Sequence, residues 1–429
     1  MVSETLLCRV DTATDIEAFV VRFPKPLDKY LYVWWYRDTS WASDSFGCTS
    51  IPNIFHFWIL DETQLTGQVG TAVPHVNLTG SECNPHVFFR GFQFFWRNGL
   101  KLLLSGYVYG GSYPKFISIY DVSDPTKPKL DKELRDGSAT AGNWWNYLAA
   151  IYLPSTDEVW FGDINGNIYY AKYDTFLTLS NFQGATKLIS GTLNSAQPHF
   201  DWLGGSILLL RLSDYNTATT KFYKIDASAK TYTDVTTTLS GYNGGGNGHR
   251  FVIGIKTSGS TITQIDLYTK PDLTLYKSLT VSISTTRVHY VTDLYDYVII
   301  VDVNQIVFVN IADGSVSTIA YTRNLNSAEM YTPSIYGFSR TGDITTTGEL
   351  YKLMLDYYYT VTYDPTTKKA TIKDQGGSPL ANATVYLADV SNELFQSADG
   401  VISVTTDANG VIDLSNYAGR VLRIVKVTT

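Results

Sequence analysis

Charge, cysteine and long apolar stretches are all scarce in this sequence. Only 17% of its 429 residues are Asp, Glu, Lys or Arg, and the net charge is -7. A phosphate-binding surface needs an excess of lysine and arginine, so we expect no nucleic-acid partner. The best apolar stretch, residues 298–311, is interrupted by Asp302, Asn304 and Gln305. It cannot supply the roughly 18 uncharged residues of a transmembrane helix, so we expect no membrane span.

The N-terminus and the cysteines set limits on the compartment. The first eleven residues hold acids and polar groups where a signal peptide needs a basic segment and then a long apolar one, so we expect no signal peptide. Three cysteines cannot make a framework of several disulfides. Cys8 lies in an apolar alternation and is expected to be a small buried residue. Cys48 and Cys83 lie in polar segments and are a candidate disulfide outside a reducing cytosol.

Aromatic residues are abundant by contrast. They make up 14% of the chain and include 31 tyrosines and nine tryptophans, a composition that indicates a β protein. The clearest unit is residues 287–321, where tight turns such as Ala312-Asp313-Gly314 separate short apolar runs. Four such runs in succession predict one antiparallel meander. Its expected strands are 289–294, 297–303, 306–311 and 315–321.

The same plan recurs along the chain. Residues 86–134 contain Asn98-Gly99, and residues 143–190 contain Asn165-Gly166. Both dipeptides favour hairpin turns because Asn and Gly readily adopt positive φ. Further units begin near Pro198, Gly248 and Ser327, and a longer one occupies about residues 10–80.

These seven meanders predict an all-β fold whose main part, residues 1–367, is a seven-bladed β-propeller. Six or eight blades stay open because the unit at 248–284 shows only three clear strands. An array of β-sandwiches is the structural alternative. The apolar segment 5–10 is expected to complete the last blade and close the ring. The glycine-rich segment 241–249 lacks the lysine and the helix of a phosphate-binding loop and is expected to be a loop between blades.

Two segments resemble known families. Residues 117–129, Ile-Ser-Ile-Tyr-Asp-Val-Ser-Asp-Pro-Thr-Lys-Pro-Lys, resemble the third strand of LVIVD-type propeller repeats, which end on an aspartate before a Ser-Asp-Pro turn. Residues 370–429 resemble transthyretin-like or carboxypeptidase-regulatory-like Ig-type modules, through Gly377-Ser-Pro-Leu-Ala-Asn-Ala-Thr-Val and Thr406-Asp-Ala-Asn-Gly. The resemblance implies a small Ig-like β-sandwich that serves as a spacer, lid or docking module. Neither resemblance implies catalysis.

Four of the six histidines stand near the start of a predicted blade: His86, His199, His249 and His289. The first strand of a propeller blade lines the centre, so these imidazoles are expected to converge at one mouth of the channel and contact a ligand. The unit that begins at Trp144-Trp145 has no histidine, and we include these two rings among the ligand-binding candidates. The alternative is architectural, with a ring nitrogen bonded to a carbonyl of the neighbouring blade. We expect no bound metal.

Catalytic motifs are missing. No Gly-x-Ser-x-Gly elbow, His-Glu-x-x-His helix or sialidase Asp-box occurs, so we expect neither enzymatic activity nor a cofactor. The oxygen-rich segment 163–169 resembles part of a calcium loop, but it lacks the distal glutamate and is expected to be a plain hairpin turn.

Several aromatic groups exceed what strand alternation needs. They are Trp34-Trp35-Tyr36, Trp41, Trp144-Trp145 and Tyr357-Tyr358-Tyr359, and they are expected either to pack between blades or to form a recognition surface for sugars or proteins. The overall texture resembles surface or host-attachment proteins of viruses, with an archaeal virus as the first expectation. We therefore predict a virion surface protein that binds a host surface glycan or protein receptor, contacts other virion proteins and acts in many copies. A propeller-based glycan hydrolase or lyase, or an intracellular, cytoplasmic scaffold, is the alternative.

Overall fold

The chain folds almost entirely into β-strands. The computed structural model describes residues 2–428, except 13–15, 25–26, 38–45, 47, 49–53, 83, 85, 109–114, 136–147, 192–195, 215–216, 218, 249, 295–296, 332–333, 342–345, 356–359, 375–376, 390–400 and 418–421. Within this part lie two short α-helices, α1 (Tyr173–Thr178) and α2 (Thr236–Leu239), and four 3-10 turns, η1 (Glu62–Gln64), η2 (Gly70–Ala72), η3 (Phe182–Gly184) and η4 (Ser415–Tyr417). None of these described helices is long and apolar enough to cross a membrane.

The described residues up to 355 form four- and five-stranded sheets, antiparallel except for the short parallel pairing of β5 with β1. We number these sheets in chain order. Sheet 1 consists of β2 (Ile16–Arg22), β3 (Tyr30–Arg37), β4 (Ile54–Asp61) and β6 (Val76–Asn77). Sheet 2 consists of β7 (His86–Trp96), β8 (Leu100–Val108), β9 (Lys115–Asp121) and β10 (Lys129–Arg135). Sheet 3 consists of β11 (Ala149–Leu153), β12 (Glu158–Gly162), β13 (Ile168–Lys172) and β14 (Thr186–Ile189). Sheet 4 consists of β15 (Ala196–Gly204), β16 (Ile207–Asp214), β17 (Thr220–Asp226) and β18 (Thr231–Asp234).

The remaining sheets of this part follow the same order. Sheet 5 consists of β19 (Gly244–Asn247), β20 (Phe251–Ser258), β21 (Thr261–Thr269) and β22 (Leu275–Ser284). Sheet 6 consists of β23 (Tyr290–Leu294), β24 (Tyr297–Val301), β25 (Gln305–Asn310) and β26 (Val316–Ala320). Sheet 7 consists of β27 (Leu325–Tyr331), β28 (Ser334–Thr341) and β29 (Thr346–Leu355), followed by β1 (Val2–Thr12) and β5 (Gln68–Val69).

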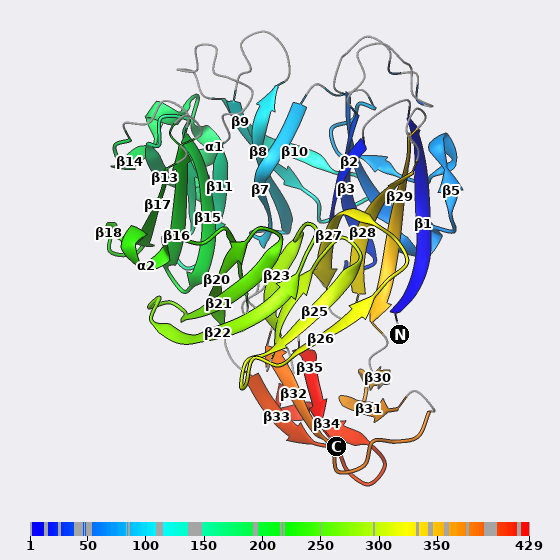
Figure 1. Cartoon of the computed structure of the whole chain (residues 1–429). Helices are drawn as coiled ribbons and strands as arrows, with labels where there is room; N and C mark the ends of the chain where they lie inside the picture. The colour runs from blue at the N-terminus through cyan, green and yellow to red at the C-terminus, as the bar shows by residue number, and fades with distance from the viewer. Residues whose placement is uncertain are drawn as a thin grey trace.

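Apolar clusters lie between consecutive sheets all the way around. Each of the seven clusters found in the described residues of this part combines side chains of two neighbouring sheets. Phe23 and Phe94, for example, pack between sheets 1 and 2 with their ring centroids 4.5 Å apart, and Trp35 and Phe338 pack between sheets 1 and 7. First strands also contact each other, as β7 does β11 and β11 does β15. Meander sheets packed face to face around a centre form a β-propeller (Figure 1), which confirms that part of the prediction.

The N-terminal strand completes the ring, as predicted for the segment 5–10. β1 pairs antiparallel with β29 over its whole length, so the first residues of the chain share a sheet with residues 346–355. The Glu4 carboxylate accepts hydrogen bonds from the backbone N–H and the hydroxyl of Thr322, each 2.6 Å long. These contacts join the first strand of the chain to the last sheet of the propeller and to Thr322 just before it.

The glycine-rich segment 241–249 is not a loop between blades, contrary to the prediction. Its residues 244–247 form β19, the first strand of sheet 5. A Cβ on Gly246 would lie 2.1 Å from the Val291 carbonyl oxygen, and one on Gly248 would lie 2.0 Å from an oxygen of Asp293. The first strands β19 and β23 approach so closely that only glycine fits at these positions. The glycine-rich sequence that results does not look like a β-strand.

Six further strands form two small C-terminal sheets. One consists of β30 (Thr360–Asp364), β31 (Lys369–Lys373) and β34 (Val411–Asp413), and the other of β33 (Val401–Thr405), β32 (Thr384–Asp389) and β35 (Leu422–Thr428). A shared core of Ile372, Val385, Leu387 and their neighbours joins the two sheets. β30 pairs antiparallel with β31, so residues 360–364 share a sheet with residues 369–373.

The C-terminal sheets lie beyond one rim of the propeller (Figure 1). The first and third strands of a meander run in the same direction and end at the same rim, and β29 is the third strand of sheet 7. The chain therefore leaves the ring at the rim where first strands end, which we call the module rim. Tyr386 of β32 packs against the apolar cluster between sheets 6 and 7. The opposite rim, the far rim, faces away from these sheets.

Candidate functional site

The predicted ligand residue His199 lies on the first strand of sheet 4, beside a carboxylate. Alternation along β15 places His199 and Asp201 on the same face of the sheet, the one turned toward sheet 5. His199 Nε2 lies 3.4 Å from Asp201 Oδ1. The two side chains are 33% and 26% exposed, so both can be reached by solvent. The imidazole and the carboxylate therefore form a pair on the first strand of sheet 4, on the face that adjoins sheet 5.

Two permanent cations complete the group, which we call the inner cluster: His199, Asp201, Arg211 and Lys270. Arg211 of β16 is the direct register partner of His199, and Lys270 follows β21 of sheet 5 and donates from Nζ to the Gly248 carbonyl at 2.5 Å. Burial alone would raise the pKa of Asp201, but His199, Arg211 and Lys270 together lower it. Asp201 is therefore ionised at neutral pH, and the two permanent cations exceed its single negative charge.

His199 Nδ1 and Asn247 Oδ1 are buried at this junction and have no hydrogen-bond partner within the described part of the chain. The amide nitrogen of Asn247 donates to the Trp202 carbonyl across the two sheets at 3.0 Å, which fixes the side chain with its oxygen in place. Unsatisfied buried polar atoms are uncommon and call for a water or a ligand group. The inner cluster can therefore take a polar ligand with both donors and acceptors.

The other predicted histidines do not join this cluster in the described residues. His289 Nε2 lies 2.9 Å from the Leu325 carbonyl oxygen of sheet 7, which is the architectural alternative of a ring bonded to the neighbouring blade. Burial lowers the pKa of His289, and this backbone contact opposes the shift only in part. His86 begins β7, but its side chain lies outside the described residues, as does all of His249.

A buried carboxylate holds the start of β20. Asp293 of β23 accepts the backbone N–H of Arg250 at 3.1 Å and that of Phe251 at 3.3 Å. Arg250 Nε lies 3.4 Å from the same carboxylate. Asp293 is fully buried, so these bonds fix Arg250 and the start of β20 to sheet 6. Its role is structural, and it is not part of the inner cluster.

The predicted aromatic and cysteine residues have separate outcomes. Trp144 and Trp145 lie outside the described residues, as do Trp41 and Tyr357 to Tyr359. Trp34 and Trp35 pack between sheets, because consecutive residues of a strand point to opposite faces. Cys8 is free and buried, as predicted, and burial raises its pKa to about 12. Cys48 is buried and disulfide-bonded, whereas Cys83 lies outside the described residues, so their pairing stays a prediction.

A second histidine group was missed by sequence reasoning. His75 Nε2 lies 3.1 Å from Glu82 Oε1, and the ring stacks on Trp58 at 4.2 Å. Burial opposes the charge on His75, but Glu82 outweighs it and raises the pKa of the histidine. Burial also acts to raise the pKa of Glu82, but its hydrogen bonds to His75 and Asn77 lower it overall. No repeat marks these residues, since they lie between β4 and β7, although a histidine seven residues before a glutamate is visible in the sequence.

Metal chemistry finds no support among the described residues, where no group of three or more His, Cys, Asp or Glu side chains could hold an ion. The oxygen-rich segment at 163–169 is a hairpin turn, as predicted. Asp163 accepts from the backbone N–H groups of Asn165 and Asn167, from the Asn167 amide and from the Tyr169 hydroxyl. Its carboxylate is used within the turn.

Comparison with known proteins adds a general likeness. No family model and no curated protein matches this sequence. The chain is similar to the WD40 domain of Neurospora crassa Pan2, with 8% identity over 81% of this chain and 95% of that one and a TM-score of 0.43. It is also similar to Saccharomyces cerevisiae Sqt1, with 8% identity over 81% of this chain and 98% of that one and a TM-score of 0.42. The chain's own sheet order and packing make it an all-β propeller of four- and five-stranded sheets.

Proposed function

We propose that this chain is a non-enzymatic binding protein displayed on the exterior of a virion, where its propeller contacts a host glycan or protein receptor. The observation that carries the proposal is the inner cluster. Its four side chains are partly exposed, its two permanent cations exceed its one carboxylate, and His199 Nδ1 has no partner among the described residues. Such a site suits an acidic or hydroxyl-rich ligand group, because arginine and lysine donate to oxygens without needing a change of protonation.

The two-part architecture supports the same proposal. We propose that the seven sheets are the blades of one seven-bladed ring and that the C-terminal sheets are a transthyretin-like, Ig-type module. The seven inter-sheet clusters support the first statement, and the shared core of two facing sheets supports the second. The module would contact other virion proteins, while the inner cluster of the ring contacts the receptor. Weak single contacts would gain avidity from many copies.

A catalytic alternative has one observation in its favour. A carboxylate beside an imidazole is the arrangement that orients a general base. A glycan hydrolase uses two carboxyl groups that flank the scissile bond, and Asp201 is the one carboxylate of the inner cluster as described. Turnover of acidic glycans by the full chain, abolished by His199→Ala, would favour the enzyme over the binding protein.

The proposal is tested by binding of the full chain to an array of acidic and neutral glycans. The chain is presented both as a monomer and as a streptavidin tetramer. We expect a clear signal from the tetramer on acidic glycans and a weak one from the monomer. Lys270→Gln should weaken the tetramer signal about tenfold, the scale of one lost charged hydrogen bond. Lys224→Gln is the matched control, because Lys224 lies on β17 outside the inner cluster and pairs only loosely with Asp272 at 3.7 Å.

Absence of a tetramer signal on glycans and on host surface proteins would contradict the proposal. Equal loss in the Lys270 and Lys224 variants would contradict the assignment of the inner cluster. Equal affinity of monomer and tetramer would contradict the multivalent mechanism.

A further inference from the structure

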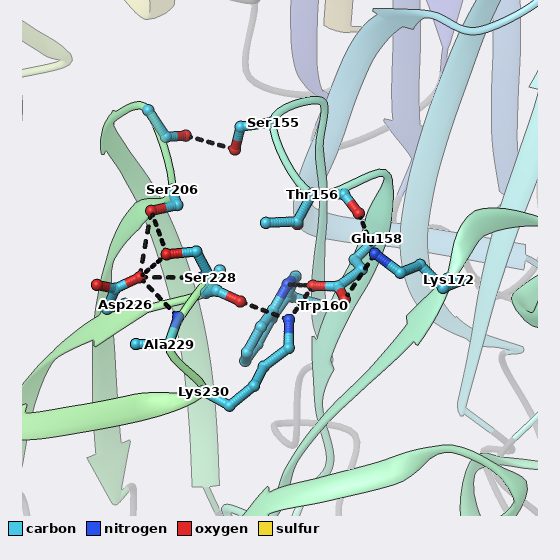
Figure 2. Close-up of polar contacts among 12 residues, drawn as sticks. Ser155, Thr156, Glu158, Trp160, Lys172, Ser206, Asp226, Ser228, Ala229 and Lys230 are labelled. Atoms are coloured by element: carbon cyan, nitrogen blue, oxygen red, sulfur yellow. Dashed lines mark hydrogen bonds and ion pairs between the residues drawn. The ribbon is translucent and has the colours of Figure 1, made fainter.

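Sheets 3 and 4 are joined on the module rim by a buried carboxylate and a lysine (Figure 2). Glu158 begins β12 and is 3% exposed, and Lys230 lies in the turn between β17 and β18. Lys230 Nζ lies 2.5 Å from Glu158 Oε2 and also donates to the Ala227 carbonyl. Lys230 of sheet 4 therefore places its ammonium group against the Glu158 carboxylate of sheet 3.

Two aromatic rings of sheet 3 lie against the same ammonium group. Lys230 Nζ lies 4.5 Å from the ring centroid of Tyr170 and 5.1 Å from that of Trp160. The two rings are stacked on each other, 4.8 Å apart with an interplanar angle of 21°. The Trp160 indole N–H also points to Glu158 Oε2 at 3.2 Å, which fixes carboxylate and ring together. Aromatic faces within about 6 Å attract a cation, most strongly where water is excluded.

The residues of sheet 3 that contact the Lys230 ammonium do not need Lys230 to stay in place. Lys172 Nζ lies 3.3 Å from the other carboxylate oxygen of Glu158 and donates to the Thr156 carbonyl at 2.6 Å. Burial would raise the pKa of Glu158, but Lys230, Thr156 and Lys172 lower it. Glu158 thus keeps a cation partner if Lys230 is removed, and the rings belong to sheet 3 alone.

We propose that Glu158, Trp160 and Tyr170 form a binding site for a primary alkylammonium group, which this chain fills with its own Lys230. Lys230 acts as a tethered ligand that locks the outer part of sheet 4 onto sheet 3. Its tether is a tight turn in which Lys230 has a φ of +57° and Asp226 accepts the backbone N–H groups of Ser228 and Ala229. Ile225 and Ala227 of this hairpin pack in the apolar cluster between sheets 3 and 4, whereas the next strand, β18, is exposed along its whole length. A lysine side chain of a partner protein has the chemistry to compete for the same site.

The expected ligand preference follows from the contacts. Two of the three N–H groups of an ammonium are needed for Glu158 and the Ala227 carbonyl, and the rings cover another side. A quaternary ammonium has no N–H group, so it should bind more weakly than a primary one. Lys230 is 29% exposed, which gives a small amine a path to the site once the side chain is shortened.

The test is chemical rescue of Lys230→Ala in the full chain. The variant should melt about 2 °C below the wild type, and n-butylammonium chloride should restore about half of that loss in a saturable manner, because a ligand of the folded state stabilises by RT ln(1 + [L]/Kd). Sodium chloride at equal ionic strength and tetramethylammonium chloride should restore less. The wild type, whose site is filled, and Lys230→Ala/Glu158→Gln should show no saturable rise. A rise that is equal in all of these proteins and salts would overturn the proposal.

A second measurement uses the unmodified chain and does not depend on a variant that folds. Mild acetylation followed by peptide mass spectrometry compares Lys230 with Lys172, which is 62% exposed. Lys230 should react at least about tenfold more slowly, because its side chain is only 29% exposed and its ammonium lies against two aromatic rings. Equal rates for the two lysines would show that the site is not occupied and would contradict the proposal.

Discussion

The propeller and the C-terminal sheets use the same kind of strand but bury very different side chains. The largest fully buried residues, Trp35, Trp58 and Trp160 among them, all lie in the propeller. Within the described residues, the buried side chains of the C-terminal core are Ala370, Ile372, Val385, Leu387 and Ile412, none of which is aromatic. Free energy from apolar burial grows with the area removed from water, so the ring can stabilise itself. The small sheets must depend more on turn hydrogen bonds and on Tyr386, which packs against the ring.

The largest effect is expected in an aromatic cluster of the ring. Trp58→Ala removes a fully buried indole that packs edge-on against Trp35 at 5.6 Å and stacks on His75. We expect a loss of about 3–5 kcal/mol in the free energy of unfolding, measured by urea titration. Trp96→Ala is the matched control, because Trp96 is 48% exposed. Equal losses in both variants would break the comparison.

The core of the C-terminal sheets should respond locally. Leu387→Ala removes a side chain that is 1% exposed and should cost about 2–4 kcal/mol. Hydrogen exchange should rise across residues 360–428 and stay unchanged in the ring. Val361→Ala, at a position 43% exposed, is the control. An equal rise of exchange in the propeller would show that the two parts unfold together.

Crowding at the centre of the ring can be tested within one strand. Gly246→Ala places a methyl group 2.1 Å from the Val291 carbonyl and should cost about 1–3 kcal/mol. Gly244→Ala, two residues earlier in β19, meets nothing within 4 Å and should change stability by less than about 0.5 kcal/mol. Thermal melts of both variants check this, and similar melting temperatures would contradict the close packing of β19 and β23.

The smallest expected effect distinguishes the two parts by pH. All six histidines precede residue 290, so between pH 6 and 8 only the ring should change stability. The pKa of His75 is raised in the folded state, so its stabilisation is lost as pH rises through that pKa. The pKa of His289 is lowered, so its effect has the opposite sign and costs stability as pH falls through 6.5.

Two variants separate these contributions. His75→Gln should lower stability by about 1 kcal/mol at pH 6, the typical net contribution of one hydrogen bond, and by less at pH 8. His289→Gln should remove the opposing slope. A pH dependence of exchange in residues 360–428 that equals that of the ring would contradict the comparison.

Local turn chemistry made the repeated strands predictable. Asn98 and Gly99 both have positive φ, as the hairpin signal requires, and Gly166 does too. The aspartate that ends the LVIVD-like strand, Asp121, belongs to a wider repeat. Asp61, Asp121, Asp226 and Asn310 each end a third strand and accept the backbone N–H two residues later. The acceptor is a side-chain oxygen in all four, of a carboxylate in three and of an amide in Asn310, although the surrounding sequences differ.

The candidate site was predictable only in part, because its members come from different strands. His199 and Asp201 share a face by alternation, which the sequence shows directly. Arg211 joins them through the register of β15 with β16, and Lys270 comes from another sheet. The spacing of such residues along the chain carries no trace of their proximity. For the same reason Lys230 and Glu158, 72 residues apart, gave no signal.

The central claim, display on a particle, is tested most directly by quantitative mass spectrometry of purified particles and surface fractions from the organism that makes this chain. The account predicts the chain in many copies on the particle exterior, where brief protease treatment of intact particles cleaves it. Its confinement to the soluble interior of the cell, with none on any particle or surface, would contradict the account and favour an enzyme or an intracellular scaffold.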